Sequence, residues 1–449
     1  MNPRVVIAGT ASGSGKTTAV CTVLTLLKRR GVNVKACKCG PDYIDPTFHA
    51  AVLGVESANL DPFFCDNALL RRLLNENAGK DLTVIEGVMG YYDGTGENGT
   101  DNSTYTVASE TDSPVILMLD GKGAAASLLA QAEGFLRFRS DSRIKGVLFN
   151  RITAGTYAYL EKLMRNRFGD AVVPVGYIPA FPAEYAIPSR HLGLVTAGEI
   201  EDLQTRINAV ADLCGDTVDL DRLFAVARTA GELDVQTPAI PQLDPVKIAA
   251  AKDAAFCFYY KDTFRLLENM GAELLPFSPL GNEPVPAGAS GLLLGGGYPE
   301  LYAERLEKNT IAKESIKNAV WSGLPTIAEC GGFQYLGKAL DGHAMCGVLE
   351  HESADTGRLV RFGYVTLTAK EDGLLGPAGT QLPGHEFHYW DSTFNGASFT
   401  AEKPNGKRWD CAIHTPTLYA GYPHLFLPAN PEAAEAFYRK CLAYKENHK

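Results

Sequence analysis

This chain of 449 residues lacks long apolar runs, an export signal and paired cysteines. None of its apolar stretches reaches the roughly eighteen residues that a membrane-spanning helix needs, and no basic segment precedes an apolar core near the first residue. Its ten cysteines are scattered, without a Cys-x-x-Cys pair or a zinc-binding spacing. We therefore expect a cytoplasmic protein without disulfides or structural zinc.

Positive charge is also scarce, because 42 lysines and arginines stand against 52 aspartates and glutamates, for a net charge of -10. No long basic run offsets this excess, which argues against a nucleic-acid partner. The apolar and charged fractions, 45% and 21%, are those of a globular protein. The length allows two or three domains.

A glycine-rich loop at residues 9–18, with the sequence GTASGSGKTT, stands between an apolar run at 5–8 and a second apolar stretch at 20–24. A strand, a glycine loop and a helix in this order form a cradle whose backbone N–H groups and helix N-terminus attract phosphate oxygens. In such a cradle Lys16 reaches the terminal phosphates and Thr17 ligates magnesium. The motif predicts an ATP site with Mg²⁺ as cofactor, made of Gly13, Ser14, Gly15, Lys16, Thr17 and Thr18.

From residue 1 to about 230, apolar strands alternate with helical stretches, which is the pattern of parallel strands joined by helical crossovers. Ligands gather at the carboxyl ends of such strands, where the acids and glycines of this half fall. A proline-bearing segment at 231–245 predicts a linker, and a second alternation follows it. The expected strands are 5–8, 34–37, 82–86, 115–119, 144–149 and 172–178, then 248–258, 273–276, 291–294, 326–329 and 360–368, with helices at 302–322 and 332–339.

Four acidic residues follow expected strands in the first half. Asp42 and Asp45 stand in the loop KCGPDYIDP, which suits a metal or an acidic substrate but is also a common solvated turn. Glu86 closes an apolar strand, as the acid of a Walker B motif does. Asp93 follows in MGYYDG, which is equally typical of a turn. The residues alone do not decide which of these aspartates joins Thr17 and Glu86 at a magnesium ion.

In the second half, Cys330 lies between an apolar strand and a helix in PTIAECGGFQYL, as in a nucleophile elbow that exposes the sulfur. A helix N-terminus at this point favours the thiolate. Upstream, Gly296 and Gly297 belong to a strand end, LLLGGGYPE, whose N–H groups would stabilise an oxyanion. The candidate bases are the histidines at 343, 351, 385, 388, 414 and 424, among which the residues alone do not choose.

Together these motifs resemble the cobyrinic acid a,c-diamide synthase family over nearly the whole chain. The resemblance rests on GPDYIDP, EGVMGYYDG, SRHLGLV, GGGYPE, AECGGFQYL and GHEFHY. It also rests on the phosphate loop, where Gly9 and Gly15 enclose five residues, as in dethiobiotin synthetase, and not the four of the common Walker form. The resemblance implies an α/β chain with a P-loop, doubly wound parallel sheet similar to dethiobiotin synthetase at 1–232, a linker at 233–245, and an α/β class I glutamine amidotransferase domain at 246–449.

The resemblance implies an ATP- and glutamine-dependent ligase of cobalamin biosynthesis, in which Cys330 is the nucleophile and His424 its base. Triad amidotransferases carry a glutamate two residues after that histidine, where this chain has Phe426. Glu386 and His388 are then the candidates to orient His424, or they face the second substrate. The resemblance also implies that the magnesium ligands are Thr17, Asp42 and Glu86. The residues that would position the corrinoid carboxylate are Tyr43, Asp45, Asp93, Arg190 and His191.

Close alternatives are amidation of hydrogenobyrinic acid, which lacks cobalt, or of nickel sirohydrochlorin, because enzymes acting on them share these motifs. A different class is a P-loop regulatory ATPase fused to a non-catalytic amidotransferase-like binding module, against which an intact Cys330 and His424 argue. The expected partners are small molecules, namely a corrinoid polycarboxylate, glutamine and ATP, with no nucleic acid or membrane and with the oligomeric state left open. Because the net charge of -10 repels a polycarboxylate, the local field should be made positive by Lys38, Arg151, Arg190 or His191.

Overall fold

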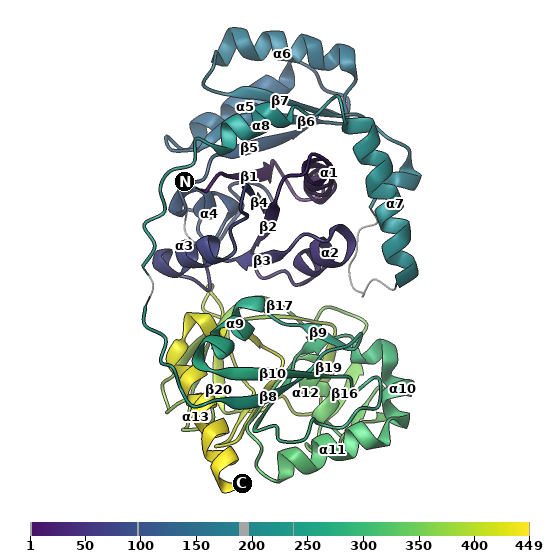
Figure 1. Cartoon of the computed structure of the whole chain (residues 1–449), viewed down its shortest axis with the longest axis vertical. Coiled ribbons are helices and arrows are strands. Elements are labelled where there is room, and N and C mark those ends of the chain that lie inside the picture. The colour runs from purple at the N-terminus through teal and green to yellow at the C-terminus, as the bar shows by residue number, and fades with distance from the viewer. Residues whose placement is uncertain (1, 97, 188–196, 237, 449) are drawn as a thin grey trace. The chain divides into compact units, whose positions relative to one another are not determined.

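The computed structural model describes residues 2–96, 98–187, 197–236 and 238–448 (Figure 1). The chain folds into two compact units, Met1–Thr237 and Pro238–Lys449. The described residues between 231 and 245 are in neither helix nor strand. None of the helices in these ranges is long and apolar enough to cross a membrane.

The first unit is built on a sheet of seven parallel strands in the order β3-β2-β4-β1-β5-β6-β7. Six strands lie where the apolar segments predict them, whereas β3 escapes prediction because its four residues, SANL, include serine and asparagine. Strand β1 lies between β4 and β5, and Ile7 pairs with Glu86, so the carboxyl ends of β1 and β4 adjoin. The strands are β1 (Arg4–Gly9), β2 (Val34–Cys39), β3 (Ser57–Leu60), β4 (Leu82–Glu86), β5 (Val115–Asp120), β6 (Ile144–Asn150) and β7 (Val173–Ile178).

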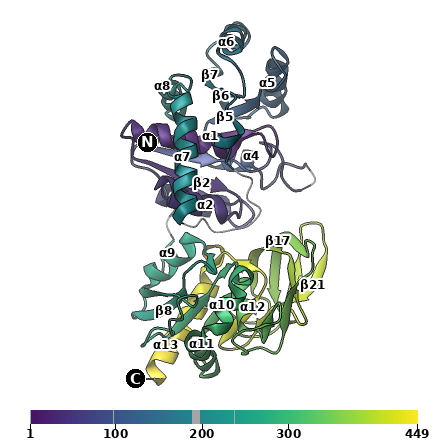
Figure 2. The same cartoon turned by 90° about the vertical axis from the view of Figure 1, so that its right-hand side faces the viewer.

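One face of this sheet is covered by α1 (Lys16–Arg29), α2 (Ile44–Leu53), α7 (Ala197–Cys214) and α8 (Leu220–Ala227), whose apolar side chains share a core with the strands. Helices α1, α2 and α7 lie side by side (Figures 1 and 2). This packing fixes the N-terminus of α1 at the end of β1, where the glycine loop begins. The other helices are α3 (Asn67–Glu76), α4 (Thr104–Glu110), α5 (Ser127–Phe138), α6 (Ala154–Phe168) and the 3₁₀ turn η1 (Ala183–Tyr185).

The second unit combines a six-stranded sheet, β10-β8-β11-β13-β23-β22, with a five-stranded antiparallel sheet, β21-β20-β17-β18-β24. The six-stranded sheet is parallel except for β22, and both sheets contribute to one apolar core. The chain passes from β23 in one sheet to β24 in the other through two residues, which places Cys330 after β13 close to the segment that carries His424.

The elements of the second unit follow in chain order. Its strands are β8 (Val246–Ala251), β9 (Phe256–Phe258), β10 (Ala272–Phe277), β11 (Gly291–Leu294), β12 (Gly296–Gly297), β13 (Thr326–Glu329), β14 (Ala339–Leu340), β15 (His343–Ala344), β16 (Glu352–Asp355), β17 (Arg361–Ala369), β18 (Gln381–His388), β19 (Trp390–Ser392), β20 (Phe399–Glu402), β21 (Arg408–Cys411), β22 (Ile413–His414), β23 (Leu418–Gly421) and β24 (His424–Leu425). Its helical segments are α9 (Lys261–Met270), η2 (Pro299–Tyr302), α10 (Ala303–Lys308), α11 (Thr310–Trp321), α12 (Gly331–Leu336), η3 (Leu427–Ala429) and α13 (Pro431–Asn447).

Two elements predicted as continuous are broken by a polar side chain. The strand predicted at 248–258 is divided into β8 and β9, because Asp253 holds a turn by accepting the N–H of Ala255 at 2.8 Å. The helix predicted at 302–322 is divided into α10 and α11 at Asn309, whose side-chain amide donates to two carbonyl oxygens at 2.9 and 3.0 Å. Both predictions were wrong because a polar side chain bonds to backbone groups, Asp253 in its own turn and Asn309 in the loop at Pro279 and Leu280.

Candidate active sites

The glycine loop between β1 and α1 is held in shape by left-handed backbone at two glycines. Gly13 has φ 71° and Gly15 has φ 94°, which other residues rarely adopt. Asn150, at the end of β6, donates its side-chain amide to the carbonyl of Ser14 at 3.0 Å. A Cβ on Gly15 would lie 2.7 Å from that amide nitrogen. The loop therefore needs glycine at residue 15, both for its backbone conformation and for space.

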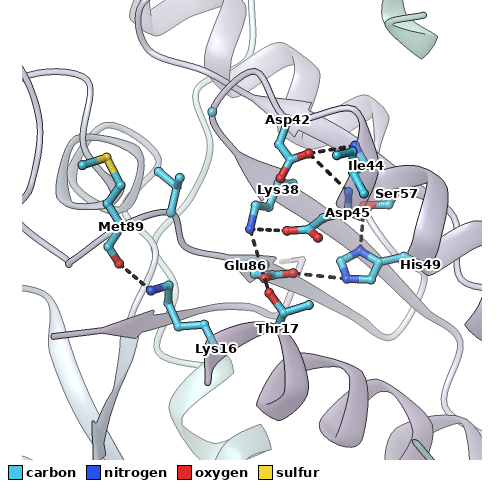
Figure 3. A network of polar contacts seen from close by, with 12 residues as sticks. Lys16, Thr17, Lys38, Asp42, Ile44, Asp45, His49, Ser57, Glu86 and Met89 are labelled. Carbon is cyan, nitrogen blue, oxygen red and sulfur yellow. Dashed lines mark hydrogen bonds and ion pairs between the residues drawn. The ribbon is translucent and has the colours of Figure 1, made fainter. Parts of the chain in front are cut away.

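Lys16, the first residue of α1, is buried against the loop that it serves. Its Nζ donates to the carbonyl of Ala11 at 2.9 Å and to that of Met89 at 2.5 Å (Figure 3). Burial lowers the pKa of Lys16 to about 8, and the charge of Lys38 adds to this shift. A cavity of about 590 Å³ opens beside the loop, lined by Ser12, Gly13, Gly15, Lys16, Thr17, Thr18, Asp42, Ile44, Asp45, Phe48 and Ile187.

Glu86, the last residue of β4, is the centre of a buried polar network (Figure 3). Its Oε1 accepts the hydroxyl of Thr17 at 2.7 Å and the ammonium of Lys38 at 3.0 Å. Its Oε2 lies 3.2 Å from Nε2 of His49, and Nδ1 of the same ring lies 3.2 Å from Oγ of Ser57. The structure thus brings together Thr17 and Glu86, two of the three predicted magnesium ligands.

Lys38 joins the carboxylate of Glu86 to that of Asp45, whose Oδ2 lies 2.5 Å from its Nζ (Figure 3). Burial alone would lower the pKa of Lys38, but Glu86 and then Asp45 raise it above its ordinary value. Burial likewise would raise the pKa of Glu86, but Lys38 and His49 hold it below its usual range. Burial raises the pKa of Asp45 to about 6, with Glu86 adding to the shift and Lys38 opposing it. The site therefore balances buried charges of both signs.

Three other predicted residues of this half, Asp42, Tyr43 and Asp93, fall within the described residues. Asp42 lines the cavity, and its Oδ1 accepts the N–H of Ile44 at 2.7 Å. Tyr43 stands at the start of α2, and Asp93 is exposed with Oδ2 accepting the N–H of Gly90 at 2.8 Å. Arg190 and His191 lie outside the residues that the structure describes.

The donors around Thr17 fit a magnesium ion. The hydroxyl of Thr17 and the carboxylates of Glu86 and Asp42 are all oxygen ligands, which Mg²⁺ prefers. Within the described ranges, no group of three or more His, Cys, Asp or Glu side chains is placed to hold a metal by itself.

In the second unit, Cys330 stands at the tight turn between β13 and α12. Its φ is 47°, its N–H donates to the carbonyl of Gly421 at 2.8 Å, and its carbonyl accepts the N–H of Gln334 at 2.9 Å. A Cβ on Gly332 would lie 2.0 Å from the carbonyl oxygen of Leu294, so this residue must be glycine for the turn to fit. The elbow predicted from the sequence is therefore present in the backbone.

The resting thiol is not activated in the way that the sequence suggests. Burial raises the pKa of Cys330, and the carboxylate of Glu300 raises it further. Helix α12 has six residues, which limits what its N-terminus offers a thiolate. Burial lowers the pKa of His424 to about 3, with His385 and His388 adding to the shift, so its imidazole is neutral at pH 7.

The predicted oxyanion loop lies against the predicted base. Gly296 and Gly297 form β12, which pairs with β9, and a Cβ on Gly296 would lie 2.3 Å from Cε1 of His424. A Cβ on Gly331, the residue after Cys330, would lie 3.2 Å from the nitrogen of Gly297. The structure therefore gathers the elbow, the glycine loop and His424 at one end of the six-stranded sheet.

The candidates for orienting His424 have other neighbours. Oε2 of Glu386 lies 3.8 Å from Nε of Arg361 and 3.9 Å from Nε2 of His388. The ring of His388 is stacked on Tyr422 at 3.9 Å, and its Nδ1 lies 2.6 Å from the carbonyl of Trp390. These contacts link Glu386 to β17, and His388 to β19 and to the residue after β23.

The comparisons with known proteins cover both units. Residues 5–195 match the family model of the CobQ/CobB/MinD/ParA nucleotide binding domain, and residues 247–431 match that of the CobB/CobQ-like glutamine amidotransferase domain. The chain is 41% identical over 442 residues to cobyrinate a,c-diamide synthase of Listeria monocytogenes, covering 95% of this chain and 97% of that protein. The chain belongs to the cobyrinate a,c-diamide synthase family. It is also 35% identical over 469 residues to the Priestia megaterium enzyme of that name, covering 100% and 99% of the two chains.

Sequence reasoning missed three residues that this cobyrinate a,c-diamide synthase family member places in its sites. His49 and Ser57 extend the Glu86 network, but one lies on an otherwise apolar helix and the other opens the unpredicted β3. Glu329 lies 3.9 Å from His424 through Oε2 and Nδ1. A signal for Glu329 was available, because TIAE closes an apolar strand on an acid just as TVIE does at Glu86.

Proposed function

We propose that this chain converts the a and c acetate carboxylates of cobyrinic acid to amides, consuming one ATP and one glutamine for each amide. We expect it to act in the cytoplasm, where both co-substrates are available. The observation that carries the proposal is that one chain of this family holds both a phosphate loop beside a buried acidic network and a cysteine elbow beside a buried neutral histidine.

Both sites are required by the chemistry of the reaction. A carboxylate does not react with ammonia at neutral pH, because its oxygen is too poor a leaving group. Transfer of the γ-phosphoryl group of ATP to a carboxylate oxygen gives an acyl phosphate and ADP. Ammonia then attacks the acyl carbon, phosphate leaves, and the amide forms. The second site supplies the ammonia by hydrolysing glutamine to glutamate.

In the first unit, we assign the positioning of ATP to Lys16 and to the N–H groups of residues 13–18. Lys16 is already paired with two carbonyl oxygens, so the terminal phosphates would replace Ala11 and Met89 as its acceptors. Thr17, Glu86 and Asp42 would hold Mg²⁺, which when bound neutralises phosphate charge. Positioning and charge neutralisation are the main contributions that a protein makes to phosphoryl transfer.

In the second unit, we assign the nucleophile to Cys330 and the general base to His424. Nε2 of the neutral imidazole takes the thiol proton, and the sulfur attacks the amide carbon of glutamine. The N–H groups of Gly296 and Gly297 would stabilise the oxyanion of the tetrahedral intermediate. The proton then passes to the departing nitrogen, which leaves as ammonia, and water hydrolyses the thioester. Because Cys330 rests as the thiol, glutamine turnover depends on the base.

The corrinoid carboxylate would be held by Tyr43, Asp45 and Asp93 around the loop after β2, with Arg190 and His191 supplying positive charge. Two of the four cations expected to offset the net charge of -10 are already engaged. Lys38 bridges Asp45 and Glu86, and Arg151 forms an ion pair with Asp120. Arg190 and His191 stay candidates from the sequence, and we expect R190A to weaken corrinoid binding most at low salt.

The test is mass spectrometry of the products formed with ATP, glutamine and a panel of cobyrinic acid, hydrogenobyrinic acid and nickel sirohydrochlorin. Gain of two amide groups on cobyrinic acid, with two ADP and two glutamates, is the expected result. If another member of the panel is amidated in preference, that compound and not cobyrinic acid is the substrate. Absence of glutamine hydrolysis would favour a P-loop regulatory ATPase. C330A should lose glutamine-dependent amidation but retain amidation with added ammonium, and loss of both would refute the division of labour.

A further inference from the structure

Glu329 ends β13 directly before the elbow cysteine and faces the strand that carries His424. Its Oε2 lies 3.9 Å from Nδ1 of His424, and its Oε1 accepts the backbone N–H of Leu425 at 3.0 Å. The Glu329 side chain is 13% exposed and that of His424 is 4% exposed. One carboxylate thus contacts both residues of β24, one through the imidazole and the other through the backbone.

The position at which triad amidotransferases carry their orienting glutamate is filled here by an apolar side chain. Phe426 is buried, and its ring packs edge to face against Tyr260 with centroids 5.1 Å apart. Glu386, the other carboxylate considered for this role, lies within 4 Å of Arg361 and His388. The geometry therefore favours Glu329, the residue before Cys330, as the carboxylate that orients His424.

We propose that Glu329 is a positioning residue for the glutaminase reaction, accepting the Nδ1 proton of His424 and so leaving Nε2 free to take the thiol proton of Cys330. This inference rests on the proposed function. A neutral imidazole carries one proton, and the group beside one nitrogen decides which nitrogen is the base. When Nε2 receives the thiol proton, the ionised carboxylate stabilises the imidazolium without itself gaining a proton. The same proton later leaves with ammonia, so Glu329 is unchanged over the cycle.

The separation of 3.9 Å is longer than a hydrogen bond, and catalytic hydrogen bonds are often long before the substrate is bound. Glu329 also lines a cavity of about 20 Å³, together with Tyr259, Tyr260, Thr263, Leu293, Leu294, Gly295, Ile327, Leu425 and Leu427.

The surroundings of the pair make its protonation sensitive to pH. Burial raises the pKa of Glu329 to about 8, opposed by the N–H of Leu425. Only the ionised carboxylate stabilises the imidazolium by its charge, so glutaminase activity should rise with pH as Glu329 loses its proton. The titratable groups that face the pair from neighbouring elements are Tyr259 before α9, Glu300 in η2, Cys330, His385, Glu386 and His388 on β18, and Tyr419 on β23.

The experiment measures kcat and kcat/KM for glutamine between pH 5.5 and 9.5 in the full chain and in E329Q, E386Q and E307Q. Glu307 is the matched control, because Oε2 lies 2.9 Å from Nδ1 of His343 in a surface pair that is 38% and 37% exposed. Amidation with added ammonium is measured beside it and reports that each variant is folded. E329D, which keeps the carboxylate, is included as the conservative variant.

We expect E329Q to lower kcat by about 10²–10⁴-fold and to lose the rise of glutaminase activity with pH. E329D should keep that rise, and E307Q should match the unchanged chain. Ammonium-dependent amidation should stay within about 2-fold in all of them. The inference is overturned if E329Q keeps the kcat and pH profile of the unchanged chain, or if E386Q and not E329Q removes the rise. Absence of glutaminase activity from the unchanged chain is a separate result, which refutes the proposed function itself.

Discussion

Replacing Lys38 with methionine should destabilise the first unit more than any surface substitution. The ammonium lies 2.5 Å from Asp45 and 3.0 Å from Glu86, with 6% of the Lys38 side chain exposed. Methionine keeps most of the aliphatic stem but leaves two neighbouring buried carboxylates without their shared cation. Removing one partner of a buried ion pair costs about 3–5 kcal/mol. For a unit of this size that corresponds to a fall in melting temperature of roughly 6–20 °C.

The loss should depend on pH. Glu86, whose pKa is held low by Lys38 and His49 against the effect of burial, stabilises the fold above its unfolded pKa and loses that contribution as pH falls. Burial raises the pKa of Asp45 to about 6, so its contribution to folding stability has the opposite pH dependence. That contribution is complete below the unfolded pKa of Asp45 and is lost as pH rises through about 6. Without Lys38 both carboxyl groups bind protons more tightly. The destabilisation should therefore be greatest above pH 7 and shrink toward pH 5.

The assay is thermal unfolding of the full chain at pH 7.5 and pH 5, following the transition that added ATP shifts upward, which reports the nucleotide-binding unit. The matched control is K35M on the same strand, because Lys35 pairs with Glu56 at 3.0 Å where the two side chains are 31% and 60% exposed. An exposed pair of this kind is worth less than about 1 kcal/mol. Equal shifts for K38M and K35M at pH 7.5, or a K38M shift that does not change with pH, would refute the reasoning.

Three further substitutions separate the two active sites. T17V removes the hydroxyl that bonds Glu86 at 2.7 Å and should lower ATP-dependent amidation by at least about 10–100-fold at unchanged glutaminase activity, whereas an equal loss of both would contradict the assignment. N150A removes the hydrogen bond to the glycine loop and should raise KM for ATP about 5–10-fold with little change in kcat, so an unaltered KM would count against it. G296A places a Cβ 2.3 Å from the His424 ring and should lower glutamine-dependent amidation about 100-fold while sparing the ammonium reaction, so loss of the ammonium reaction would point to misfolding.

Much of the first site could be predicted from the sequence because its signals are local. The apolar strand, the glycines at 13 and 15 and the Gly-Lys-Thr sequence are contiguous, and each constrains the next. Thr17 bonds to Glu86 because β1, which leads into the glycine loop, lies beside β4, which ends at Glu86. The sequence predicts this acid because an apolar strand closes on it. Local patterns thus specified the backbone of the cradle and one of its acids.

The residues that escaped prediction act through contacts distant in sequence. His49 reaches Glu86 only because α2 packs against β2 and β3, next to β4 in the sheet. Ser57 is brought to His49 by a strand too polar to be recognised. Asp253 and Asn309 broke predicted elements because their side chains bond to backbone groups of a neighbouring loop. Periodicity reports which face of an element is apolar, but it carries no information on such tertiary partners.

The backbone of Cys330 has an evolutionary consequence. Its φ of 47° is a conformation that glycine adopts without steric cost and that other residues adopt at roughly 1–3 kcal/mol. Glycine at residue 330 would relax this turn and fold more easily, but it would remove the nucleophile of the glutaminase reaction. Keeping cysteine at this turn therefore requires selection for the glutaminase reaction against local stability. We expect loss of that reaction to be a common early step when such a chain evolves toward a new role. A lineage that had taken that step would show glycine at this turn while its phosphate loop remained intact.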